Sequence, residues 1–99
     1  MQTKRHAPPR YWIEFEDRHN KAQRTHPLVY RSPYEAHIDA YRERRDSDRG
    51  AIYRYQHGRL YRCRINSMVF CAVPDYEREE KLETLAWIMG ITKEQLLAA

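Results

Sequence analysis

The chain has 99 residues, of which 41% are hydrophobic and 32% charged, a balance typical of one small folded domain and not of a disordered segment. No apolar run approaches the length of a membrane span, and residues 1–10 lack the apolar core of a signal peptide, so we expect a cytoplasmic protein. With only three glycines, the chain contains no phosphate-binding or dinucleotide-binding loop.

Positive charge is concentrated in the N-terminal part of the chain. Residues 1–74 contain 15 Lys and Arg against 8 Asp and Glu, a net charge of +7, whereas residues 75–99 contain 3 against 6, a net charge of −3. Fourteen of the 18 basic residues are arginine, whose planar fork suits phosphate or carboxylate and stacks on aromatic rings. A GC-rich genome would produce the same excess, so composition alone does not separate a binding role from codon usage.

The first elements are a polar arm and two strands. Residues 1–10 are basic and rich in proline, and we expect a flexible arm there, followed by a single domain over residues 11–99. Residues 11–16 alternate between apolar and polar side chains, which predicts a strand. A second short strand is expected over residues 24–31, where Pro27 restricts its start to an edge or a bulge.

A helix is predicted to follow. Ser32 suits the N-cap, Pro33 suits the first turn, and Glu35 is placed to complete a capping box. The helix should run to about Arg45. Its apolar residues share one face at the spacing typical of an amphipathic helix. They are Tyr34, Ile38 and Tyr41.

Residues 51–73 alternate aromatic or aliphatic side chains with arginine, which predicts a three-stranded meander with tight turns at residues 57–58 and 66–67. Cys63 and Cys71 then face opposite sides of the sheet, so we expect no disulfide. One face carries Ile52, Cys63, Ile65, Met68, Phe70 and Ala72. The other carries Tyr53, Tyr55, Leu60, Arg62, Arg64, Val69, Cys71 and Val73.

The C-terminal part is expected to be helical. Asp75 begins an acidic helix that Gly90 ends, with Leu82, Leu85, Ala86 and Met89 as its apolar stripe. A capping box from Thr92 to Gln95 predicts a third helix over about residues 93–98. Residues 82–99 resemble a helix-turn-helix, but their acidic charge favours a helical hairpin that caps the sheet or docks on a protein.

Together these elements predict an α+β fold in the order β-β-α-β-β-β-α-α. We expect a small antiparallel sheet with helices packed on one face and a C-terminal helical hairpin.

The face that pairs tyrosine with arginine is the main candidate for binding. Such a face stacks bases in RNA-binding sheets, and Tyr and Arg are also enriched in protein interfaces, whereas simple cross-strand packing would need no partner. All three interpretations stay open. The candidate partner-binding residues are Tyr53, Tyr55, Arg62, Arg64, Arg54, Arg59 and Trp87.

No catalytic set, metal site or cofactor site is predicted. The histidines are scattered, and Glu14, Glu16 and Asp17 near His19 lack a second set of ligands. Cys63 has no neighbour in sequence that would stabilise a thiolate in a strand. We therefore expect a protein that is not an enzyme.

Two segments and the acidic C-terminal helix carry a resemblance. The segments are YWIEFEDRH and SPYEAHIDAYRERR. In these the chain resembles small bacteriophage proteins that inhibit host nucleic-acid machinery, and is most similar to the anti-RecBCD proteins of lambdoid phages. The resemblance implies a monomer in the host cytoplasm that docks on a large nuclease–helicase acting on DNA. Because the net charge is +4, inhibition by DNA mimicry is disfavoured, and arginines would be free to touch the DNA.

Two alternatives remain open beside this interpretation. One is a nucleic-acid-binding protein that uses the Tyr/Arg sheet face. The other is a small structural or assembly subunit.

Overall fold

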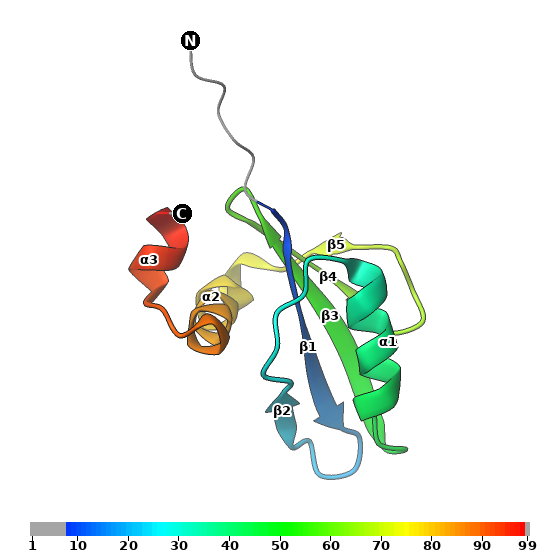
Figure 1. Cartoon of the computed structure of the whole chain (residues 1–99). Helices are drawn as coiled ribbons and strands as arrows, with labels where there is room; N and C mark the ends of the chain where they lie inside the picture. The colour runs from blue at the N-terminus through cyan, green and yellow to red at the C-terminus, as the bar shows by residue number, and fades with distance from the viewer. Residues whose placement is uncertain (1–7, 99) are drawn as a thin grey trace.

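The computed structural model describes residues 8–98, and most of the expected N-terminal arm lies outside them. The α+β class and the predicted order of elements are confirmed (Figure 1). The elements are β1 (Arg10–Asp17), β2 (Gln23–Thr25), α1 (Pro33–Glu43), β3 (Asp48–Gln56), β4 (Arg59–Arg64), β5 (Cys71–Ala72), α2 (Asp75–Met89) and α3 (Lys93–Ala98). No helix among these residues is both long enough and apolar enough to cross a bilayer.

The five strands form one antiparallel sheet in the order β2-β1-β3-β4-β5. The expected second strand is divided, because only residues 23–25 pair as β2 before Pro27 interrupts the ladder. The chain returns to β1 at Tyr30, which exchanges backbone hydrogen bonds of 2.9 and 2.8 Å with Tyr11. β2 is therefore a short edge strand, as the proline predicts.

The meander has the predicted register but a different second turn. His57 and Gly58 both have positive φ, of 52° and 75°, and form the two-residue hairpin turn expected between β3 and β4. The second turn is centred on residues 65–66, because the N–H of Ser67 donates to the carbonyl of Arg64 and Asn66 has φ of 80°. The predicted tight turn at residues 66–67 is thus wrong, because residues 65–70 form a longer connection that begins with this turn, although Arg62 still pairs with Cys71 as expected.

Helices cover both faces of the sheet, whereas the sequence placed them on one. Each face carries its own apolar cluster, because β1 and β3 present large apolar side chains on both sides. The cluster under α1 contains Tyr11, Ile13, Phe15, Ala36, Ala40, Ile52, Cys63 and Ile65. The cluster under α2 and α3 contains Trp12, Tyr53, Leu60, Val73, Leu82, Leu85, Ala86 and Leu96.

α1 packs on the sheet through small residues. Ser32 caps the helix by accepting the N–H of Tyr34, and the helix ends two residues before the expected Arg45. Ala36 and Ala40 are fully buried, which lets the helix backbone approach β1 and β3 closely. The predicted apolar face is therefore turned outward: Tyr34, Ile38 and Tyr41 are 70%, 53% and 55% exposed.

The C-terminal hairpin forms as predicted. Gly90 ends α2 in the left-handed conformation with φ of 70°, and its N–H caps the last turn. The Thr92 hydroxyl accepts the N–H of Gln95 at 3.0 Å while the Gln95 side chain accepts the N–H of Thr92 at 2.9 Å, which is the expected capping box. The hairpin packs on the sheet through Leu82, Leu85 and Leu96.

The buried carboxylate of Asp48 joins the segment after α1 to β2 and to the start of β3. Asp48, at the start of β3, is 2% exposed. Its Oδ2 accepts the N–H of Arg45 at 2.8 Å and lies 2.6 Å from Nη1 of Arg24. The other terminal nitrogen of Arg24, Nη2, donates to the carbonyl of Glu43. Burial alone would raise the pKa of Asp48, but the hydrogen bonds from Arg45 and Arg24 outweigh it and hold the pKa below 3.8.

Asp48→Asn should therefore destabilise the protein in a pH-dependent way. Because the folded-state pKa is lowered, the contribution of Asp48 is present above the unfolded-state pKa of about 4 and is lost as the pH falls through the folded value. We expect a loss of about 2 kcal/mol at pH 7 and a much smaller loss at low pH. Urea midpoints for both proteins at the two pH values measure this, and a pH-independent difference would contradict it.

Gly50→Ala should destabilise the fold by about 1–3 kcal/mol through steric overlap. An added Cβ would overlap Cδ1 of Ile65 and would lie 3.3 Å from Cδ1 of Phe15. Chemical denaturation of Gly50→Ala, Ile65→Val and the double variant tests this. Ile65→Val removes the overlapping Cδ1, so it should lower the free energy of unfolding by less in the Gly50→Ala background than in the wild type. Strictly additive effects of the two substitutions would refute the overlap.

Candidate functional site

The centre of the predicted Tyr/Arg face is buried under α2. The Tyr53 ring stacks on Trp12 with 5.1 Å between ring centroids and an interplanar angle of 15°. Nζ of Lys81 from α2 lies over the same ring, 4.8 Å from its centroid. Tyr53 is only 4% exposed, so its prediction as a surface contact is wrong: α2 covers it.

A buried ion pair holds α2 at this position. Nζ of Lys81 lies 2.6 Å from Oε1 of Glu14, and the two side chains are 8% and 14% exposed. The indole N–H of Trp12 donates to the other oxygen of Glu14 at 2.8 Å. Burial alone would lower the pKa of Lys81, but the hydrogen bond and charge of Glu14 outweigh it, so the pKa is raised.

Arg62 also joins the sheet to α2. Its two terminal nitrogens contact the two carboxylate oxygens of Glu77 at 2.8 and 3.1 Å, and Nη1 lies 3.4 Å from the hydroxyl of Tyr53. The hydrogen bond to Glu77 is the main cause of the raised pKa of Arg62. Arg62 therefore has a structural partner in Glu77 of α2, which the cross-strand packing interpretation did not include.

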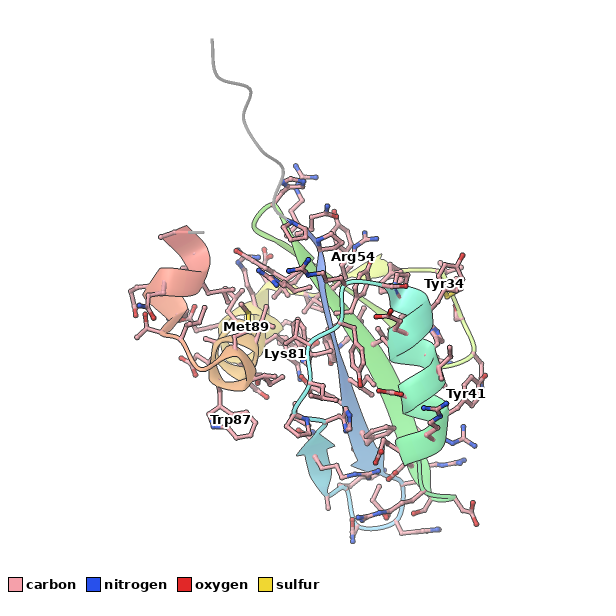
Figure 2. All side chains as sticks on the ribbon, in the orientation of Figure 1. Tyr34, Tyr41, Arg54, Lys81, Trp87 and Met89 are labelled. Carbon is pink, nitrogen blue, oxygen red and sulfur yellow. The ribbon has the colours of Figure 1, made fainter. Side chains whose placement is uncertain are left out.

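The remaining candidate residues do not share one surface. Tyr55 packs at the margin of the cluster under α2, while the Arg54 guanidinium lies on the α1 side, 4.6 and 4.9 Å from the ring centroids of Tyr61 and Phe70. Arg59, beside the β3–β4 turn, and Arg64 are exposed. Trp87 is 68% exposed and points away from the sheet on α2 (Figure 2).

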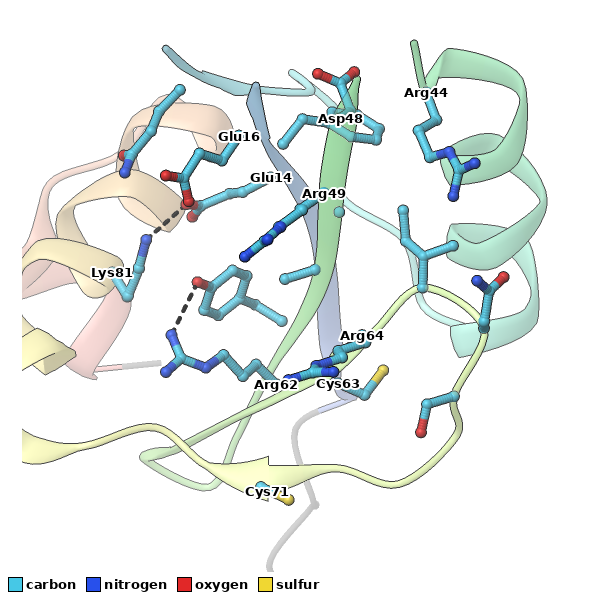
Figure 3. A pocket seen from close by; sticks show the side chains of 18 of the residues that line it. Glu14, Glu16, Arg44, Asp48, Arg49, Arg62, Cys63, Arg64, Cys71 and Lys81 are labelled. Atoms are coloured by element: carbon cyan, nitrogen blue, oxygen red, sulfur yellow. Dashed lines mark hydrogen bonds and ion pairs between the residues drawn. The ribbon is translucent and has the colours of Figure 1, made fainter. Parts of the chain in front are cut away.

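Beyond the edge of α2, the sheet face is open and concave. The concavity has a volume of about 1170 Å³, begins at the Glu14–Lys81 pair at the edge of α2 and continues past the end of β4 to residues 65–67 (Figure 3). Along it, Glu14 and Arg64 flank Ala51, and Glu16 pairs with Arg49. We call this region the arginine concavity, defined by Arg18, Arg44, Arg49 and Arg64 in its lining.

A second surface lies on the opposite side of the sheet. Tyr34, Ile38 and Tyr41 form a stripe along α1, called here the α1 patch, and Figure 2 shows both tyrosines pointing away from the sheet. Residues 65–70 run beside this helix. The His37 ring joins the two, with its nitrogens 2.8 Å from the carbonyl oxygen of Pro33 and 3.0 Å from that of Ser67.

The orientation of the α1 patch was missed at the level of sequence. A second helical face, Ala36 with Ala40 four residues later, was available as the packing face. Tyr41 is further held by its hydrogen bond to Asn66, and Met68 in the adjoining segment is 47% exposed.

Reactive chemistry is weak among the described residues. Burial raises the pKa of the Cys63 thiol to about 11, so it is a poor nucleophile at neutral pH. The carboxylate of Asp17 accepts the N–H groups of His19 and Asn20 and so closes the β1–β2 turn. No group of three His, Cys, Asp or Glu residues within residues 8–98 is arranged to hold a metal ion.

Lys81→Met should be strongly destabilising because it leaves the Glu14 carboxylate buried without a cation. We expect a loss of about 3 kcal/mol in the free energy of unfolding. Adding Glu14→Gln removes the orphaned charge and should recover part of the loss. Denaturation of the four proteins in this double-mutant cycle measures the coupling, and independent effects of the two substitutions would show that the pair is not coupled.

Comparison of the chain with family models, curated proteins and solved structures finds no match. The chemistry of the two surfaces is therefore the basis for assigning a function.

Proposed function

We propose that this chain is a non-enzymatic binding protein that docks through the α1 patch on a host nuclease–helicase or a related DNA-processing complex and inhibits or modulates it. The observation that carries the proposal is the outward orientation of Tyr34, Ile38 and Tyr41 on a helix that needs none of them for its own packing. Exposed apolar residues gathered on one helix face are typical of a protein interaction site.

The spacing of the patch suits insertion into a groove. The three residues lie at positions i, i+4 and i+7, which is how a helix presents its anchors to an apolar groove of a partner. Tyrosine is also among the residues that contribute most to protein interfaces. A protein partner with a hydrophobic groove is the occupant that this chemistry fits.

The patch is held rigid before any partner binds. Ala36 and Ala40 fix the helix on the sheet, and Ser32 caps its first turn. On the far side, His37 ties the helix to the segment that contains Met68. A preorganised patch loses little conformational entropy on binding, which favours tight association.

The target class rests on the resemblance to the anti-RecBCD proteins of lambdoid phages. The segment SPYEAHIDAYRERR, which carries part of that resemblance, begins at the Ser32 cap and contains the whole α1 patch. The segment that carries part of the resemblance is therefore also the segment with the exposed docking chemistry.

Binding to purified RecBCD tests the proposal directly. We expect Tyr34→Ala and Ile38→Asp each to weaken the affinity by about 2 kcal/mol, roughly 30-fold, in biolayer interferometry. Tyr76→Ala is the matched control, because Tyr76 is an 86% exposed aromatic residue on α2. Circular dichroism checks that each variant is folded.

The outcomes separate the parts of the proposal. If the wild-type protein does not bind RecBCD, the target is wrong. If it binds and the α1 variants bind as tightly as Tyr76→Ala, the docking surface is wrong. A wild-type protein that self-associates in light scattering, and whose α1 variants are monomeric, would favour an assembly subunit instead.

A further inference from the structure

The arginine concavity carries a surplus of positive charge. Two of the cations in its lining are already neutralised, Lys81 by Glu14 and Arg62 by Glu77. Asp48 is likewise neutralised by Arg24. Within residues 8–98, Arg44, Arg49 and Arg64 form no ion pair, and Arg18 donates only to the carbonyls of Asp46 and Ser47.

These four guanidinium groups come from separate segments that the fold brings together. Arg49 and Arg64 project from neighbouring strands on the face that α2 leaves open, whereas Arg44, which follows α1, lies on the other side of β3 (Figure 3). Arg18 lies just beyond β1. Glu16, opposite Arg49, is the one carboxylate of the described lining without an ion-pair partner, so the surplus remains positive.

We propose that the arginine concavity binds the phosphodiester backbone of nucleic acid without reading its base sequence. Several exposed arginine forks over one concave surface match a polymer that carries a phosphate at every nucleotide. The phosphate contacts depend on Arg49 and Arg64, which project from the sheet face opposite α1, whereas the side chains of the α1 patch point outward from the helix.

The composition of the concavity favours nucleic acid over an acidic protein segment. Protein interfaces depend on an apolar core, usually with aromatic anchors. The aromatic side chains that line the concavity, Phe15 and Tyr53, are both buried, at 2% and 4% exposure. A polar and positively charged surface is instead typical of protein–nucleic acid interfaces.

The same burial explains why base reading is not expected. Bases stack on aromatic rings that are open on one side. The Tyr53 ring stacks on Trp12, lies near Nζ of Lys81 and is only 4% exposed. The interpretation of this face as a tyrosine stacking platform is therefore replaced by one of phosphate contacts from arginine alone.

Fluorescence anisotropy with fluorescein-labelled DNA, as a 30-nucleotide single strand and a 30-base-pair duplex, tests the proposal on the full-length chain. Binding should weaken steeply as KCl is raised from 50 to 200 mM. The double variant Arg49→Gln/Arg64→Gln should make the negative slope of log K against log salt concentration shallower, by about 1.4 for the single strand and about 1.8 for the duplex. Oligonucleotides of unrelated sequence should bind alike.

Arg31→Gln/Arg59→Gln is the matched control, because both arginines are exposed, lie outside the concavity and leave the same net charge. An equal loss in this control would show diffuse charge attraction and overturn the site. Wild-type protein that binds neither DNA would overturn it as well. Binding of the protein to poly-glutamate without binding to either DNA would overturn it too, because that outcome would define a site for an acidic protein.

The two proposals fail separately. Tyr34→Ala, which tests the α1 patch, should bind both oligonucleotides as tightly as the wild type. A reduced DNA affinity in this variant would contradict the assignment of DNA to the opposite face.

Discussion

The stack of Trp12, Tyr53 and Lys81, closed by the ion pair from Lys81 to Glu14, is the interaction on which the rest of the structure depends. It fixes α2 over one part of the sheet face and leaves the remainder open. A buried charge is tolerated there because Glu14 is satisfied on both oxygens, by Lys81 and by the Trp12 indole. Removing either partner would leave a desolvated charge between α2 and the sheet.

The position of α2 has a direct consequence for function. It buries Tyr53 and engages Arg62 with Glu77, so two of the residues expected to bind a partner stabilise the fold instead. It also leaves Arg49 and Arg64 without carboxylate partners on the open part of the face. The acidic α2 therefore neutralises part of the positive sheet face and leaves the rest with a surplus of charge.

The two sides of the sheet present different chemistry. The α1 side offers tyrosine and isoleucine on a rigid helix, and the α2 side offers arginine around a concave surface. A protein that docks on a DNA-processing complex would have use for both, one for the protein and one for the DNA that the complex holds. Tyr34 and Ile38 lie on the outer side of α1, and Arg49 and Arg64 project from the opposite face of the sheet, so each pair can be substituted separately.

Both faces of the sheet need cover because β1 alternates Tyr11, Ile13 and Phe15 with Trp12. The alternation over residues 11–16 is visible in the sequence, and it places Trp12 with Glu14 and Glu16 on the side opposite Tyr11, Ile13 and Phe15. A single large aromatic residue on the polar side was the signal for a second layer. Trp12 is fully buried because α2 provides that layer.

Local chemistry was sufficient to determine the type and order of the elements of this protein. The Ser32 cap, the His57–Gly58 turn, the Gly90 stop and the Thr92–Gln95 capping box depend on near neighbours, and each lies where the residues predict it. Strand register followed too, because the alternation and the first turn constrain it. Neither surface was predictable in the same way. Which helix face packs inward depended on how closely α1 approaches the sheet, which favours Ala36 and Ala40 over the larger stripe. Which arginines stay unpaired depended on where the carboxylates of a distant helix come to lie, and only the tertiary structure decides that.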